Sequence, residues 1–453
     1  MLWTNMKSTK KFPASLSFSN LKIKYDNQKS LANKIDLINK NQKSIYSTND
    51  RIKILKSLKS FLIKHKFNLV NLINSEAHKT KNESLGEFDY ALEFVDYSIN
   101  LLSKYKFNKK TSSNRYIFLK SPGSVFAITP YNDPLAGMTR KIAPSIASGS
   151  ALIMKTSSYC INLCNYFDSN LPKKLKDILQ FAFIKNKKDI DRIIQNKNIK
   201  LITFTGSTNI GLKLDNIQTN HLQRKVLELG GINYALIFDK NNLDKVIDEI
   251  LIRKIKAAGQ ACSSINKVFV HKSLKLDFEK MIKLKLSKIF CGSVNNNLNP
   301  HFGPLISKSH FDFTKKLELK ALKNGKLISR AKSYNNTDNL FPLTVISSKI
   351  DDPVFDTYET FSPLLGVAYF SSDKKIFNKI SRSEYSLVCY IFSNNSKIID
   401  KTKSLNFGSI GINTTKIQSP SCPTGGNNLS GIGREGGEWG FEEFLTTVNY
   451  VIN

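Results

Sequence analysis

The segment Lys200-Leu-Ile-Thr-Phe-Thr-Gly-Ser-Thr-Asn-Ile-Gly211 begins with a strand-like apolar run, turns at a glycine and opens a helix-like sequence. Free backbone N–H groups and the positive end of a helix dipole suit such a turn to holding a phosphate. The turn lacks the usual Gly-x-Gly-x-x-Gly spacing, so an ordinary strand-to-helix connection stays an alternative. The order strand, turn, helix predicts one unit of an α/β fold.

Similar units lie on both sides of this segment. Strand-like runs occur at 116–120, 124–129, 150–155, 234–238 and 267–271. Upstream, residues 47–76 and 87–102 have apolar residues at helical spacing, with Thr48 or Asn49 as the expected cap. The glycines between 425 and 440 predict turns and not a helix, and residues 444–452 predict a last strand. The alternation indicates an α/β architecture with mostly parallel sheets.

The composition is that of a globular protein of two or three domains. The chain has 453 residues, of which 41% are hydrophobic and 23% charged. No apolar run is long enough for a membrane helix, so no membrane partner is predicted, and the first residues lack the apolar core of a signal peptide. Six scattered cysteines do not form a disulfide framework. These features predict a reduced, cytoplasmic protein.

The formal charge of +32 raises the question of a nucleic-acid partner. Only nine of the 68 basic residues are arginine, and the lysines are spread along the chain. Arginine is preferred for bidentate contacts to phosphates and bases. We therefore expect no nucleic-acid partner and assign the lysines to solvated surfaces.

Two segments carry polar side chains at rigid or glycine-rich turns. In Thr129-Pro-Tyr-Asn-Asp-Pro134 the prolines fix a turn after a strand, where the amide of Asn132 is placed to donate to an oxyanion. In Leu227-Glu-Leu-Gly-Gly231 a carboxylate, Glu228, precedes two glycines that allow close approach of another segment. Each segment by itself fits an ordinary turn equally well, with a capping Asn or a surface Glu.

The segment Gly259-Gln-Ala-Cys-Ser263 places Cys262 in a setting suited to a nucleophile. No metal-ligand spacing lies nearby, so no metal is predicted. The alternative for a lone cysteine is a buried structural role. The other five lack a comparable setting and are assigned to packing or to the surface: Cys160, Cys164, Cys291, Cys389 and Cys422.

Together these segments resemble the aldehyde dehydrogenase superfamily, in the same order and with close spacing, over residues 45–453. Asn132 precedes Lys155 by 23 positions, Glu228 precedes Cys262 by 34, and Cys262 precedes Glu359 by 97. Tyr358-Glu-Thr-Phe-Ser-Pro363 looks like the family's Glu-x-Phe-Gly-Pro element, and the glycine-rich end looks like its closing motif. Several motifs in order are far more specific than any one.

The resemblance implies the residue roles. Cys262 would attack the aldehyde, Asn132 and the Cys262 N–H would stabilise the oxyanion, and Glu228 would activate water. NADP or NAD would accept the hydride. The implied cofactor-binding residues are Thr129, Pro130, Lys155, Ser158, Gly206, Ser207, Glu359 and Phe361.

The implied fold has a doubly wound cofactor domain over residues 1–107 and 123–229 and an α/β catalytic domain over 230–423. A small oligomerisation sheet from 108–122 and 436–453 would give a homodimer or homotetramer. The sequence departs from the family at its front, where the first strands are reduced to about residues 11–24, and at 158–171, which is shorter than expected.

Substrate and cofactor preference follow from smaller features. Residues 133–141 resemble those of succinate-semialdehyde dehydrogenases, whose arginine, here Arg140, binds a distal carboxylate; Lys272 is a second candidate cation. We expect an anionic semialdehyde, although Arg140 could instead pair with Asp133. Members restricted to NAD commonly have Glu where Ser158 stands, so NADP is expected to be accepted at least as well as NAD.

Two other functions stay open. In a CoA-acylating enzyme a thiol would take the acyl group in place of water, and the presence of Glu228 argues against it. A non-catalytic binding or structural member of the family would reduce no cofactor with any aldehyde.

Overall fold

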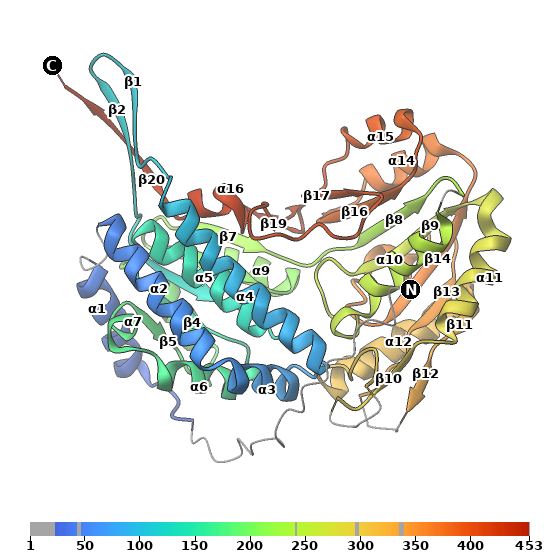
Figure 1. Cartoon of the computed structure of the whole chain (residues 1–453), viewed down its shortest axis with the longest axis horizontal. Coiled ribbons are helices and arrows are strands. Elements are labelled where there is room, and N and C mark those ends of the chain that lie inside the picture. The colour runs from blue at the N-terminus through green and yellow to red at the C-terminus, as the bar shows by residue number, and fades with distance from the viewer. Residues whose placement is uncertain (1–22, 43–46, 241, 295–298, 335–338, 453) are drawn as a thin grey trace.

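The computed structural model describes residues 23–42, 47–240, 242–294, 299–334 and 339–452. Two lobes lie side by side, each built on one large sheet, and a third, small sheet projects away from them (Figure 1). We refer to these as the first, second and third sheets. Of the predicted reduced strands at 11–24, residues 11–22 lie outside the described residues, and 23–24 are not in a strand.

The first sheet has the order β19-β7-β6-β3-β4-β5. Its parallel strands alternate with helices, and only the short β19 is antiparallel. The chain order reverses between β3 and β6, which confirms the predicted doubly wound sheet and marks the place where such sheets bind ligands. Its strands are β3 (Ser124–Ile128), β4 (Leu152–Lys155), β5 (Leu179–Phe181), β6 (Ile199–Thr205), β7 (Arg224–Glu228) and β19 (Gly431–Ile432).

The helices of this lobe cover its sheet (Figure 1), and two differ from expectation. The helix expected over 47–76 is interrupted at His65 and is capped by Ser47, whose side chain accepts from the Asp50 N–H. The helix expected over 87–102 begins earlier, at Lys81, because Thr80 forms a capping box there. The helices are α1 (Gln28–Asn41), α2 (Thr48–Lys64), α3 (Lys66–Glu76), α4 (Lys81–Leu102), α5 (Pro134–Ser148), α6 (Ile161–Asn170), α7 (Lys173–Lys176), α8 (Lys188–Ile194) and α9 (Thr208–Asp215).

The second sheet has the order β11-β13-β14-β9-β8-β16-β17 and is parallel except for β11. One face packs on a large apolar core and the other on a smaller one. Its strands are β8 (Asn233–Ile237), β9 (Ile265–His271), β11 (Lys326–Arg330), β13 (Thr344–Ser347), β14 (Leu364–Phe370), β16 (Val388–Phe392) and β17 (Ser409–Ile412). Its helices are α10 (Leu243–Ile255), α11 (Lys275–Leu286), α12 (Lys308–Asn324), α13 (Pro353–Thr357), α14 (Asp373–Ser381) and α15 (Ser396–Thr402). Two short pairs join β10 (Phe290–Gly292) to β12 (Lys332–Tyr334) and β15 (Tyr385–Ser386) to β18 (Asn427–Asn428).

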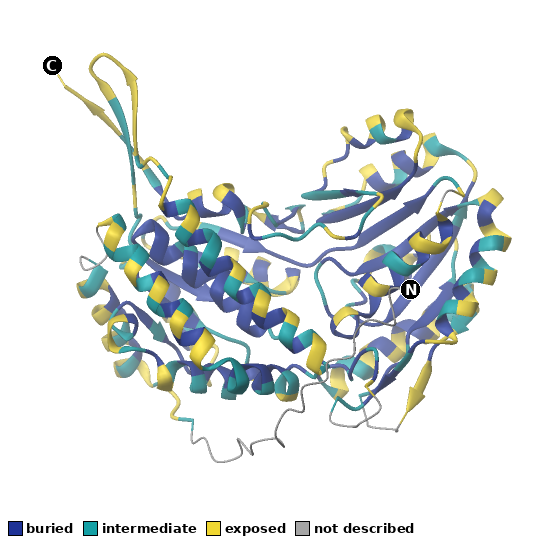
Figure 2. Cartoon of the chain, in the orientation of Figure 1, coloured by how far each residue is buried: buried dark blue, intermediate teal, exposed yellow. Residues whose placement is uncertain are grey.

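The third sheet is antiparallel and consists of β1 (Asn108–Ser112), β2 (Arg115–Lys120) and β20 (Thr446–Val451). The expected pairing of residues near 108–122 with the last strand is therefore present. Most of this sheet is exposed (Figure 2).

The glycine-rich end contains a helix, whereas its glycines predict turns. Residues 437–442 form α16 (Gly437–Glu442), so only the last part of 436–453 is a strand. Gly436 and Gly437 have positive φ angles of 72° and 63°, and Gly440 lies so close to Glu435 that a Cβ would meet its backbone at 2.5 Å. Phe441, 2% exposed, packs into the core of the first lobe. Burial of this side chain outweighs the low helix propensity of glycine.

Within the described ranges, no helix combines the length and the apolar character needed to cross a membrane.

Candidate active site

A cavity of about 280 Å³ lies between the two lobes, at the carboxyl ends of β3 and β6. Nine residues singled out from the sequence line it, although they are spread over 232 positions of the chain. They are Pro130, Asn132, Arg140, Gly206, Ser207, Glu228, Cys262, Glu359 and Phe361. The tertiary structure therefore brings together the nucleophile, the carboxylate and the amide predicted from separate motifs.

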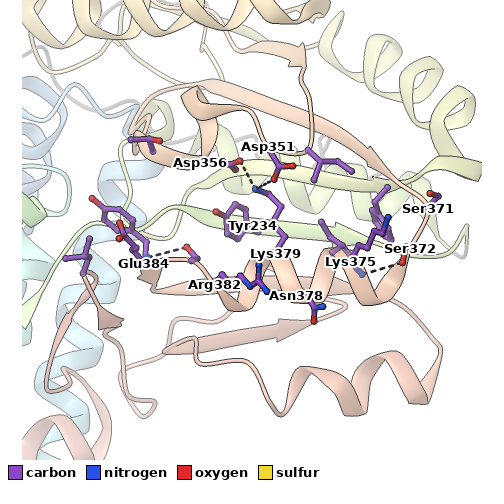
Figure 3. A pocket seen from close by; sticks show the side chains of 17 residues that line it. Tyr234, Asp351, Asp356, Ser371, Ser372, Lys375, Asn378, Lys379, Arg382 and Glu384 are labelled. Carbon is purple, nitrogen blue, oxygen red and sulfur yellow. Dashed lines mark hydrogen bonds and ion pairs between the residues drawn. The ribbon is translucent and has the colours of Figure 1, made fainter.

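A larger cavity of about 810 Å³ lies beside α14 (Figure 3). Lys379 points into it and contacts Asp351 and Asp356, each at 2.8 Å. No cysteine lines it, so we place the chemistry in the smaller cavity.

The turn that carries Cys262 is fixed by its neighbours. Gly259 has a φ of +74°, and a Cβ there would lie 2.4 Å from the Ser362 backbone, so only glycine fits. Gln260 is 2% exposed; its Oε1 accepts from the Ile306 N–H at 2.9 Å, and its Nε2 donates to the Ala257 carbonyl. This explains why Gly-Gln precedes the cysteine, whose half-buried side chain faces the cavity.

Glu228 ends β7 and lines the same cavity. It is 2% exposed, neither carboxylate oxygen has a nitrogen or oxygen donor among the described residues, and the Cys262 thiol is the side chain that interacts with it. Burial raises the pKa of Glu228 to about 7, the charge of Glu435 acts in the same direction, and Arg140 opposes both. A carboxylate with this pKa can take a proton from water at neutral pH.

The loop of Asn132 is anchored by buried charges. Glu87 accepts from the Leu135 and Ala136 N–H groups at the start of α5, at 2.8 and 3.2 Å. Lys79, 2% exposed, contacts Glu87 and Asp133, both at 2.7 Å. These contacts hold the first turn of α5, and with it the amide of Asn132, against the cavity.

Arg140 enters the cavity from α5. It is 6% exposed and lies over the rings of Tyr90 and Phe94. Its nearest carboxylate is Glu435, with Nη1 and Oε2 3.7 Å apart, and not Asp133, which pairs with Lys79. The Nε and Nη2 atoms have no partner among the described residues, so they are available to an anionic ligand.

The carboxyl edge of the first sheet fits a dinucleotide. Ser207 is the N-cap of α9 but makes no side-chain capping bond, which leaves the first turn of that helix open to a phosphate. Thr129 Oγ1 is buried without a partner in the described chain. A Cβ at Gly230 would lie 2.3 Å from Glu359, whose Oε1 accepts from the Gly231 N–H at 3.1 Å. Desolvation raises the pKa of Glu359 to about 8.

Lys155 and Ser158 lie at the next strand of this edge, outside the cavity lining. Lys155 ends β4 beside Thr129, whose N–H donates to the Lys155 carbonyl at 3.0 Å. Ser158 is exposed and opens a short 3₁₀ turn, Ser158–Cys160, before the short helix α6. Residues 155–158 include no carboxylate.

Lys272 was predicted to face the substrate, but it does not lie at the cavity. Lys272 follows the last residue of β9, whereas Cys262 lies just before the first. A strand rises about 3.3 Å per residue, so seven residues separate the two ends by roughly 20 Å. Lys272 is exposed and does not line the cavity.

Sequence reasoning missed several residues of the site. Asp133 and His310 line the cavity, and His310 Nε2 lies 2.7 Å from the Phe361 carbonyl. Lys256 lies six residues before Cys262, and its charge stabilises the ionised form of Asp133 together with that of Lys79. Burial by itself would raise the pKa of Asp133, but these cations lower it to about 2. Asp133 lies within the motif 129–134 and Lys256 lies three residues before the motif 259–263, which could have identified them as site residues. Nothing in the sequence around His310 indicates its position.

Comparison with known proteins agrees with this geometry. The model of the aldehyde dehydrogenase family matches residues 22–450. A succinate-semialdehyde dehydrogenase [NADP(+)] of Escherichia coli strain K12 is 27% identical over 409 residues, covering 87% of this chain and 84% of that protein. A D-glyceraldehyde dehydrogenase (NADP(+)) of Picrophilus torridus is 27% identical over 421 residues, covering 89% and 84%.

Solved structures share the fold. An aldehyde dehydrogenase from Brucella melitensis biovar abortus 2308 superposes with a TM-score of 0.89 at 25% identity, covering 95% of this chain and 91% of that one. A succinic semialdehyde dehydrogenase from Streptococcus pyogenes in complex with NADP+ gives 0.89 at 21% identity, covering 95% and 96%. The predicted fold is confirmed. The family match covers nearly the whole chain, and the cavity contains a cysteine and a carboxylate beside the sheet edge that fits a dinucleotide. This chain therefore belongs to the aldehyde dehydrogenase family and is an NAD(P)-dependent oxidoreductase.

Proposed function

We propose that the chain oxidises an anionic semialdehyde to the carboxylic acid, with Cys262 as nucleophile, Asn132 as oxyanion donor and Glu228 as base. The observation that carries this proposal is that these three side chains line one cavity with Arg140. An aldehyde panel with NAD and NADP tests it. Reduction of the cofactor by semialdehydes supports the proposal, and no turnover with any aldehyde favours a non-catalytic member of the family.

The residues divide the reaction into two halves. The Cys262 thiolate adds to the aldehyde carbon, and the new oxyanion accepts hydrogen bonds from the Asn132 amide and the Cys262 N–H. When bound, the nicotinamide supplies the hydride acceptor, for which the Gly206–Ser207 turn, Thr129 and Glu359 would hold the dinucleotide. Loss of the hydride leaves an acyl group on the Cys262 sulfur as a thioester.

Glu228 then serves the second half. It takes a proton from water, the resulting hydroxide attacks the thioester carbon, and the C–S bond breaks to release the acid and the Cys262 thiolate. A small cavity of about 10 Å³ lies between Glu228, Cys262 and Gly425. This is the lower limit of the space that one water needs. Because a base stands beside the thioester, we favour hydrolysis over transfer to CoA.

Arg140 is the proposed ligand of the substrate carboxylate. Its Nε and Nη2 lack partners, and Glu435 is too far for a short ion pair. Lys256 replaces Lys272 as the candidate for a second cation, because its charge acts on Asp133, which lines the cavity. Succinate semialdehyde is the first candidate substrate, as the name of the Escherichia coli relative suggests.

Replacing Arg140 by alanine is expected to lower kcat/KM for succinate semialdehyde by about ten- to a hundredfold. A charge-assisted bond to a carboxylate is worth roughly 1.5–3 kcal/mol. The same variant should change kcat/KM for butanal much less, because butanal has no charge. Initial rates with the two aldehydes measure this. Equal efficiencies in the wild type, or equal losses in the variant, would reject the anionic substrate.

We propose that NADP is accepted at least as well as NAD. Ser158 places a hydroxyl where a carboxylate would repel a 2′-phosphate, and Lys155 lies at the same strand end. Ser158→Glu should therefore raise the ratio of kcat/KM for NAD over NADP by about tenfold, roughly 1.4 kcal/mol. Ser157→Ala is a matched control. A wild type that strongly prefers NAD would contradict the proposal.

We also propose that the third sheet mediates a homodimer or homotetramer. It projects from the body (Figure 1), and Tyr450, Val451 and Ile452 are each about half exposed. Trp439 and Ile432, 61% and 55% exposed, belong to neighbouring elements of the glycine-rich end. Large apolar side chains left exposed on a projecting strand are typical of an interface. Light scattering of the full chain measures its state.

A further inference from the structure

The surroundings of Cys262 oppose formation of the thiolate. Desolvation raises the pKa of the Cys262 thiol well above its ordinary value, and the negative charges of Glu228 on β7 and of Asp133 before α5 add to this. Tyr90 on α4 and Tyr390 on β16 also lie within electrostatic reach of Cys262. The thiolate is the form that attacks an aldehyde, and a nearby positive charge favours it.

Two arginines act in the favourable direction, Arg140 on α5 and Arg253 on α10. Arg140 faces the substrate side of the cavity, so a bound carboxylate would offset part of its charge. Arg253 does not line the cavity and is 7% exposed. Its charge is therefore the same whether or not a substrate is bound.

The contacts of Arg253 place it directly behind the nucleophile. Its Nε donates to the Ser263 carbonyl at 3.1 Å, and the Tyr390 hydroxyl donates to the same oxygen at 2.8 Å. Asn233 Nδ2 donates to the carbonyls of Cys262 and Ser264, at 2.6 and 2.8 Å. Three consecutive carbonyls of the turn are thus held by buried donors.

Part of the guanidinium is left without a partner. Arg253 Nη2 is buried and has no hydrogen-bond partner among the described residues, and the group that interacts with the rest of the guanidinium besides the Ser263 carbonyl is the neutral Tyr390 hydroxyl. Burying an unpaired cationic group lowers stability. A buried group that lowers stability is typical of functional sites, where residues required for function are kept although they destabilise the fold.

We propose that Arg253 is a positioning residue that fixes the Cys262 turn through the Ser263 carbonyl and supplies the permanent buried positive charge that stabilises the thiolate. This proposal rests on Cys262 being the nucleophile. Arg253 does not line the substrate cavity, so this role does not depend on contact with the substrate.

The test separates the charge of Arg253 from its hydrogen bond. Arg253→Gln keeps a donor for the Ser263 carbonyl and loses the charge, whereas Arg253→Lys keeps the charge. The rate of Cys262 alkylation by iodoacetamide, followed by mass spectrometry across pH on the full chain without substrate, reports the thiol pKa. In Arg253→Gln the profile should move upward by about one pH unit, a tenfold slower reaction at neutral pH. Arg253→Lys should stay near the wild-type profile.

Lys254→Met is the matched control. Lys254 is the adjacent buried basic residue. Burial lowers its pKa to about 7, and its Nζ contacts Thr360 Oγ1 at 3.2 Å, within electrostatic reach of Glu359. Its removal should leave the alkylation profile in place. The turnover of Arg253→Gln should fall at neutral pH and recover toward wild type at high pH.

Three outcomes would overturn the proposal: an unshifted profile in Arg253→Gln, an equal shift in the Gln and Lys variants, or an equal shift in Lys254→Met. If Arg253→Gln does not fold, a Lys variant with the wild-type profile supports the role of charge, and a shifted one rejects it. Failure of the proposed function is distinguishable, because it would appear as activity that survives removal of Cys262.

Discussion

Replacing Cys262 by alanine is expected to abolish aldehyde oxidation while the fold survives. Without the sulfur no covalent intermediate can form, and loss of a nucleophile typically lowers turnover by about 10⁴-fold or more. The side chain is half-buried and small, so the free energy of unfolding should change by about 1 kcal/mol or less. Cofactor reduction with saturating aldehyde measures the first effect, and thermal unfolding the second.

The other cysteines provide the control. Cys160, Cys164, Cys291 and Cys389 are buried and do not line the cavity, and Cys422 is exposed. Cys422→Ala should keep wild-type turnover. Near-normal turnover of the Cys262 variant, or inactivation by iodoacetamide at a different cysteine, would show that the nucleophile is misassigned.

The second large effect is expected from Glu228→Gln. The amide cannot take a proton from water, so the thioester should accumulate and steady-state turnover should fall by about 10²–10⁴-fold. Formation of the thioester needs no water, so one equivalent of reduced cofactor per site should still appear in a burst. Stopped-flow absorbance at the wavelength of the reduced nicotinamide separates the two phases. Loss of the burst itself would place Glu228 in the first half of the reaction.

The pH dependence of deacylation follows from the same residue. Burial raises the pKa of Glu228 to about 7, and only its ionised form acts as a base. Deacylation should therefore increase as pH rises through 7 and fall by about fivefold between pH 7 and pH 6. Because the protonated form of Glu228 is the one that burial favours, the loss on the acid side reflects chemistry and not unfolding. A deacylation rate independent of pH in this range would contradict the assignment.

Local sequence was enough to propose the chemistry and to identify part of the elements. The cysteine, carboxylate and amide each lie in a short motif that can be recognised by itself. The turn of Cys262 is nevertheless held by distant segments, because Gly259 lies against the Ser362 backbone and Gln260 accepts from the Ile306 N–H. Five strands of the two large sheets, β3, β4, β6, β8 and β9, are apolar runs that the sequence identifies by themselves. Motifs and apolar runs are properties of residues that are close together in the chain, and for that reason they can be predicted from one sequence.

Tertiary structure decided which side chains meet. Lys272 is only ten residues after Cys262 but lies at the opposite end of β9. His310 is 48 residues after Cys262 and lines the cavity. Arg253 acquires its place behind the nucleophile only because Tyr390 and Ser263 meet it across the second sheet. The glycine-rich segment becomes α16 because Phe441 is buried in the first lobe. Contacts of this kind depend on packing between distant segments, which no local pattern records.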